Sequence, residues 1–144
     1  MELTTLKPSE RTIDITSPAS GQPVGIRVRI VSLDDERLER TKRQITDESL
    51  KLQAKGKSFK AHEVERNAKM LMFTGTLGWE FYNPTGKEGD EGYKPDAMPT
   101  FNGEVPDFNQ KNFMALVTQL PWIGDQISEA IGETKSFFDN LKTN

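Results

Sequence analysis

The chain has 144 residues, a length typical of one compact domain. It is 34% hydrophobic and 28% charged with a net charge of -3, a composition that favours a folded protein with a small core and excludes a membrane-spanning segment. The absence of cysteine excludes disulfides, and a single histidine excludes a multi-histidine metal site. The first residues lack the basic and apolar regions of a secretory signal, so we expect a cytoplasmic protein.

Alternating apolar and polar residues predict two β-strands near the start of the chain. Ile13 and Ile15 alternate with polar neighbours, and residues 24–30 show the same pattern. Residues 16–23 between them are rich in Ser, Pro and Gly, which is typical of a loop. We therefore predict a β-hairpin over residues 11–31. Two strands alone are only marginally stable in water, so this hairpin must pack on a helix or pair with another copy of the chain.

A helical middle is predicted over residues 34–77. Its first helix, at about 34–54, begins with an acidic turn and places Leu38, Ile45 and Leu52 seven residues apart on one narrow seam.

Gly56 is typical of the end of that first helix, and Ser58 is a candidate N-cap for the next one. The second helix, at about 59–77, repeats apolar residues every three to four positions and is expected to contribute more to the core. These residues are Ala61, Val64, Ala68 and Leu71.

The composition changes after the helical middle. Residues 78–106 contain five glycines and four prolines and predict a long irregular loop, which is uncommon inside a compact domain unless it is functional or mobile. Asp107 and Gln110 resemble a capping box and predict the start of a helix. Pro121 is tolerated in a first turn and predicts the start of another, so C-terminal helices are expected over 107–142.

Together these elements predict a single domain over residues 1–144 of the α+β class. It is predominantly helical, with an N-terminal β-hairpin, two middle helices, a long Gly/Pro-rich loop and two to three short C-terminal helices.

The chemical motifs are incomplete, which argues against an enzyme. Gly56-Lys57-Ser58 matches the end of a phosphate-binding loop, but Lys51 stands where the first glycine of that motif belongs. His62-Glu63 has no second histidine to complete a zinc motif. Acidic residues do not stand in apolar contexts that would split the pKa values of a catalytic pair. We predict no catalytic residue, no cofactor and no metal site.

Charge is distributed unevenly along the chain. Residues 34–69 carry ten basic and eight acidic groups, whereas residues 80–144 carry five basic and eleven acidic groups. A nucleic-acid surface could combine Arg27 and Arg29, which share a strand face, with the basic residues that follow. Acidic residues are interleaved with them, so a solvated face is favoured, and we expect neither a nucleic acid nor a membrane as partner.

The last third of the chain carries a recognisable pattern. It contains Phe108-x-x-x-Asn112-Phe-Met-Ala-Leu, then Leu120-Pro-Trp-Ile-x-Asp-Gln-Ile127, and it follows Gly78-Trp79 upstream. Together with Ile13, Ile15, Pro18, Gly21, Pro23, Gly25 and Ile30, this pattern resembles that of the tail assembly chaperones of long-tailed, siphovirus-type bacteriophages. The resemblance covers roughly residues 11–140. The loop at 84–106 departs from it because it is longer and richer in proline.

The resemblance implies a non-enzymatic protein that binds and solubilises the tape measure protein before the tail tube polymerises. The expected partners are the tape measure protein, the tail tube protein and further copies of the chain, in the host cytoplasm and not in the mature virion. The alternative is a structural virion protein of the head-to-tail connector or tail, in which hairpins would pair edge to edge into a ring. A small nucleic-acid-binding regulator is less favoured.

Two apolar stripes are the candidate partner-binding surfaces: the seam of the first middle helix and the face of the C-terminal helices. They could equally pack on each other as core. Their residues are Leu38, Ile45, Leu52, Phe113, Leu116, Val117, Leu120, Trp122, Ile123 and Ile127.

Overall fold

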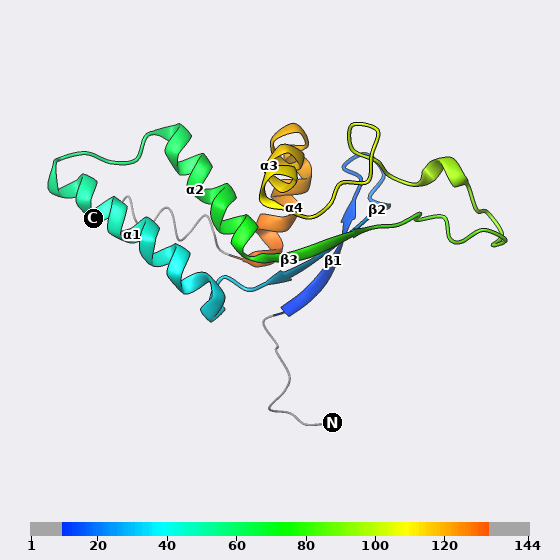
Figure 1. Cartoon of the computed structure of the whole chain (residues 1–144), viewed down its shortest axis with the longest axis horizontal. Helices are drawn as coiled ribbons and strands as arrows, with labels where there is room; N and C mark the ends of the chain where they lie inside the picture. Colours follow the sequence, from blue (N-terminus) through cyan, green and yellow to red (C-terminus); the bar gives the residue numbers. More distant parts are fainter. Residues whose placement is uncertain (1–9, 133–144) are drawn as a thin grey trace, which may run out of the picture.

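The computed structural model describes residues 10–132 and has an α+β fold (Figure 1). A three-stranded antiparallel sheet of order β1-β2-β3 carries helices on one face. In chain order the elements are β1 (Glu10–Thr16), β2 (Pro23–Val31), the 3₁₀ helix η2 (Glu36–Leu38), α1 (Glu39–Ala54), α2 (Ala61–Thr74), β3 (Thr76–Phe81), the 3₁₀ helix η3 (Pro95–Ala97), α3 (Gln110–Gln119) and α4 (Pro121–Ile131).

The predicted hairpin is present, but it is part of a larger sheet. β1 and β2 pair antiparallel with Asp14 opposite Arg27, and β3 pairs with the other edge of β2 so that Gly78 lies opposite Arg29. The sequence prediction misses β3, because it assigns residues 76–81 to the end of the second middle helix and to the irregular loop. The sheet thus gains its third strand from within the same chain.

The two predicted middle helices form, with shorter bounds than predicted. The predicted first helix, 34–54, begins instead with η2, where the Asp35 carboxylate accepts a hydrogen bond from the Arg37 backbone N–H (2.8 Å). Its end is as predicted, because Gly56 follows α1 with φ +72°. A positive φ is the backbone conformation that glycine adopts most readily.

The second middle helix, α2, begins later than the predicted residue 59. Its N-cap is Lys60 and not Ser58, and the Lys60 backbone N–H donates to Glu63 Oε1 (2.9 Å). The carboxylate of Glu63 thereby satisfies an amide that would otherwise lack a partner at the start of the helix.

The first C-terminal helix, α3, begins at Gln110, and its N-cap is Asn109 rather than the predicted Asp107. The Asn109 side chain accepts a hydrogen bond from the Asn112 N–H (2.8 Å). Pro121 opens α4 as predicted. The remainder of the predicted C-terminal helices, residues 133–142, lies outside the described residues.

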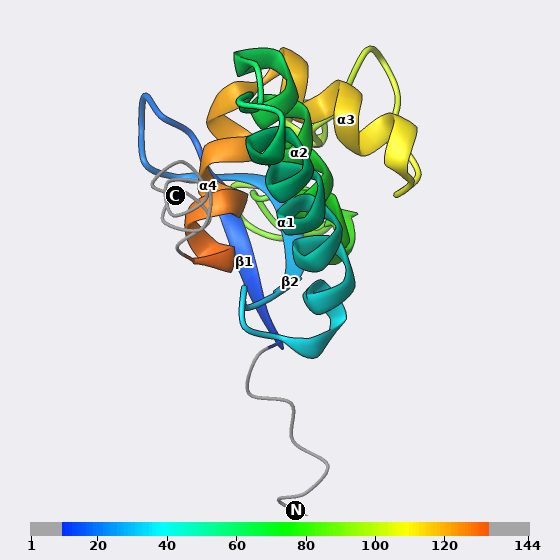
Figure 2. The ribbon, with the colours of Figure 1, turned by 90° about the vertical axis from the view of Figure 1, so that its left-hand side faces the viewer.

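The core lies between the sheet and the helices. α4 crosses β1 and β2, and Gln126 fixes it there by accepting from the Thr16 N–H (2.9 Å) and donating to the Thr16 carbonyl (2.8 Å). α2 packs against α3, α4 and α1. Figure 2 looks along the molecule from the end that carries the α1–α2 hairpin, with the sheet behind it.

An aromatic cluster joins α2, β3 and α3 inside this core. The rings of Trp79 and Phe108 have centroids 5.1 Å apart, and those of Phe73 and Phe113 are 5.3 Å apart. Such tilted and edge-on pairs add to the free energy that burial itself contributes.

Gly25 on β2 allows the backbone of Tyr82, the first residue after β3, to lie directly against β2. Its carbonyl accepts a hydrogen bond from the Tyr82 N–H (2.8 Å), and its φ is +97°. A Cβ atom at this position would lie 2.2 Å from the Tyr82 carbonyl oxygen, so only glycine fits. From there the chain runs to the far end of the molecule and returns through η3 to α3 (Figure 1).

Candidate partner-binding surface

The structure places most of the predicted partner-binding residues in the core. Leu38, Ile45, Phe113, Leu116, Val117, Ile123 and Ile127 are buried, whereas Leu52, Leu120 and Trp122 are half-buried. In this structure the seven buried residues therefore belong to the core, which was the alternative interpretation of these stripes. Direct contact with a partner remains a prediction for the three that keep exposed surface.

The α1–α2 hairpin ends in a segment that projects away from the sheet, residues 49–61, here called the hairpin tip (Figure 1). Leu50 is 51% exposed on it, and Leu52 and Phe59 are half-buried nearby. Only Ile45 and Ser49 of α1 are buried, so this helix turns most of its surface to solvent. The hairpin tip thus presents apolar side chains on a convex end of the molecule.

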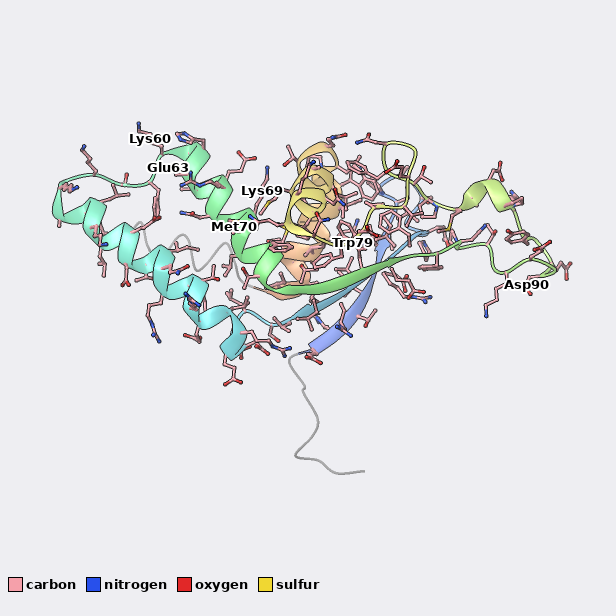
Figure 3. All side chains as sticks on the ribbon, viewed as in Figure 1. Lys60, Glu63, Lys69, Met70, Trp79 and Asp90 are labelled. Carbon is pink, nitrogen blue, oxygen red and sulfur yellow. The ribbon has the colours of Figure 1, made fainter. Side chains whose placement is uncertain are left out.

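The hairpin tip is also basic. It contains Lys51, Lys55, Lys57 and Lys60 and no acidic residue, and all four lysines are exposed. Within residues 10–132, none of the ion pairs involves these lysines. Glu63, which caps α2, is the nearest carboxylate in the sequence after the tip (Figure 3). Exposed apolar groups beside unpaired ammonium groups suit a segment that is both apolar and acidic.

A second exposed apolar side chain lies on the other side of α3. Val105 is 52% exposed and borders a concave site of about 340 Å³, here called the acidic pocket. The carboxylates of Glu104 and Asp107 line it together with the ammonium group of Lys111, so its net charge is negative. The full lining is Phe101, Asn102, Glu104, Val105, Pro106, Asp107, Lys111, Asn112 and Ala115.

The sheet face opposite the helices carries the two strand arginines. Arg27 lies 3.5 Å from the Asp14 carboxylate, and its guanidinium stacks 4.1 Å above the centre of the Tyr82 ring. Tyr82 in turn donates a hydrogen bond to Asp14. Burial, and then this hydrogen bond, raise the pKa of the Tyr82 phenol above its usual value.

Several of the basic residues considered for nucleic-acid binding are neutralised by carboxylates. Arg37 donates to Asp35 (2.9 Å) and to Glu10 (2.6 Å), and these bonds, the one to Asp35 first, raise the pKa of the guanidinium. Lys42 pairs with Glu39 (2.8 Å). These carboxylates offset part of the positive charge of this surface.

The incomplete chemical motifs lie between α1 and α2 and in the first turn of α2. Gly56-Lys57-Ser58 connects two helices and does not follow a strand, and His62 is exposed on α2. In the part of the chain that the structure describes, His, Asp and Glu side chains do not gather in groups of three or more that could hold a metal ion.

Sequence reasoning missed Leu50 and Val105, the large hydrophobic side chains with most exposure among the described residues. Leu50 falls outside the seven-residue seam, and Val105 stands alone between Glu104 and Pro106. An isolated apolar residue has no periodicity to reveal it. The run of four lysines without an acidic residue around Leu50 was the available signal.

Comparisons with protein-family models, with curated proteins and with solved structures found no match. None of the helices within residues 10–132 is both long enough and apolar enough to cross a membrane.

Proposed function

We propose that the chain is a non-enzymatic tail assembly chaperone of a long-tailed bacteriophage. It would bind and solubilise the tape measure protein in the host cytoplasm before the tail tube polymerises, and it would be left out of the mature virion. The tail tube protein and further copies of the chain are the other proposed partners. The sequence pattern supports the family, and the apolar, basic hairpin tip is the observation that supports the partner.

A long helical protein that has not yet been assembled exposes apolar seams, which require a cover in solution. Helical segments are commonly recognised through apolar anchors three, four or seven residues apart. Leu50, on the exposed side of α1, and the exposed parts of Leu52 and Phe59 offer apolar contacts on a projecting element that a rod can reach. The surrounding lysines would select acidic residues beside the seam and accelerate association.

Leu50→Glu tests this proposal, because Leu50 is half-exposed and its replacement removes the apolar anchor and adds a negative charge to the hairpin tip without disturbing the core. Co-expressed with the tape measure protein, this variant is expected to recover at least about tenfold less soluble partner, the loss that about 1.4 kcal/mol of binding free energy produces. Gln44→Glu is the matched control, since it adds the same charge at an exposed position elsewhere on α1.

If Leu50→Glu captured the tape measure protein as well as the unmodified chain does, the hairpin tip would not be its binding surface. Failure of every form to capture the tape measure protein would remove the chaperone function itself. Peptide identification from purified virions adds a second test, because a connector protein would be found in the particle and a chaperone would not.

A further inference from the structure

Among residues 10–132, the two large hydrophobic side chains with most exposure belong to segments of opposite charge. Leu50 belongs to the hairpin tip, whose four exposed lysines take part in none of the ion pairs of the described residues. Val105 lies beside Glu104 and Asp107 at the acidic pocket. Residues 84–107, which lead into this pocket, carry six carboxylates and two lysines.

The shapes of the two patches are complementary as well. The hairpin tip is a projecting turn between two helices, whereas the acidic pocket is a hollow of about 340 Å³ with Phe101 and Ala115 among its apolar walls. Leu50 is a side chain that such a hollow can receive, and lysines would then face carboxylates at its rim. The hairpin tip thus provides a projecting apolar side chain and positive charge, and the acidic pocket provides a hollow and negative charge.

One molecule cannot make this contact with itself. Figure 1 places the hairpin tip at one end of the molecule and segment 101–107 beyond α3. In Figure 3, Lys60 of the tip and Asp90 of the acidic segment stand at opposite ends of the molecule. The contact therefore has to join two copies of the chain.

We propose that the hairpin tip of one copy inserts into the acidic pocket of a second copy. The inference rests on the self-association that forms part of the proposed function, and it names the two surfaces involved. Because the contact joins two different patches, each copy keeps one free tip and one free pocket, and assembly continues beyond a dimer. A tip held in this way is covered, so the tape measure protein and a second copy would compete for it.

Two single variants test the contact with this chain alone. Leu50→Glu places a carboxylate on the hairpin tip, and Val105→Lys places an ammonium group at the pocket, where it would repel the incoming lysines. Both positions are about half exposed, so the fold should persist, which circular dichroism would verify. Gln44→Glu again serves as the control.

Sedimentation velocity should show the unmodified chain gaining mass with concentration and losing it at high salt, which screens exposed charges. Each variant alone should remain a monomer where the unmodified chain and Gln44→Glu assemble. An equimolar mixture of the two variants should form a dimer and stop there, because the intact tip of Val105→Lys fits the intact pocket of Leu50→Glu.

A monomer at every concentration of the unmodified chain would overturn the inference. So would a mixture of variants that stays monomeric, because it would then combine an intact tip and an intact pocket that do not bind each other. If either variant fails to fold, Lys55→Glu and Glu104→Lys replace the pair at exposed charged positions.

Capture of the tape measure protein tests the proposed function independently of self-association. Val105→Lys should capture the tape measure protein at least as well as the unmodified chain, because its hairpin tip is intact and uncovered. Loss of self-association with retained capture, and loss of capture with retained self-association, are thus distinct results.

Discussion

The indole N–H of Trp79 donates a hydrogen bond to the carbonyl oxygen of Pro106 (2.9 Å). Trp79 lies on β3, ahead of the long Gly- and Pro-rich segment, and Pro106 lies close to its end. A single bond therefore closes this segment at its base. It also fixes the neighbouring Val105, which borders the acidic pocket.

Trp79→Phe should lower the free energy of unfolding by about 1 kcal/mol more than ring size alone accounts for, because the Pro106 carbonyl loses its donor while an aromatic ring still packs on Phe108 and Phe113. Urea denaturation measures this loss. Trp122→Phe is the control, since it shortens a half-buried tryptophan for which the described residues include no hydrogen-bond partner. Equal losses in the two variants would show that the bond to Pro106 contributes nothing.

Leu116→Ala should cost about 2–5 kcal/mol of stability, because Leu116 is 1% exposed and its truncation leaves a cavity within the core. Gln119→Ala, on the exposed side of the same helix, should change stability by less than about 0.5 kcal/mol. Chemical denaturation compares the two. A Leu116→Ala variant that is as stable as the unmodified chain and yet fails to capture the tape measure protein would indicate that this helix face binds the partner.

Tyr82 should ionise at a higher pH than a free tyrosine, whose pKa is about 10. The unfolded chain then loses this proton first, so the free energy of unfolding should fall as the pH rises from about 10 through the pKa of the folded state. Below that range the group leaves stability unchanged. Absorbance titration of the phenolate and denaturation at several alkaline pH values, each compared with Tyr82→Phe, measure the effect. An identical pH dependence in Tyr82→Phe would contradict it.

Asn67→Leu should raise the free energy of unfolding by about 1 kcal/mol. Asn67 is buried on α2, and its side-chain nitrogen has no hydrogen-bond partner among the residues that the structure describes, so leucine removes an unsatisfied donor. Asn67→Asp is the counterpart of similar size, and it should destabilise the fold because it buries a charge instead. Thermal and urea unfolding of the three forms would test the order, and a loss of stability in Asn67→Leu would contradict it.

Local patterns predict the elements of this fold whose stabilising contacts are close in sequence. The alternation around Ile13 and Val28, the stop at Gly56 and the start at Pro121 each depend on a few neighbouring residues, and each is found in the structure. β3 was missed because Gly78 interrupts it and because the strand depends on pairing with β2, nearly 50 residues earlier. Its signal was the alternation of Leu77, Trp79 and Phe81.

The candidate surface was harder to predict than the fold. An apolar stripe indicates burial, but the sequence does not state whether the protein's own helices or a partner cover it. Leu116 and Ile127 are covered within the chain, whereas Leu50, which belongs to no stripe, is exposed. Only the three-dimensional arrangement distinguishes these cases.

The most direct test of the chaperone proposal is co-expression of this chain with the tape measure protein, followed by co-purification and measurement of the mass of the complex by light scattering. The proposal predicts a soluble complex that contains several copies of this chain for each tape measure protein. A tape measure protein that remains insoluble, beside a chain that purifies alone, would contradict it.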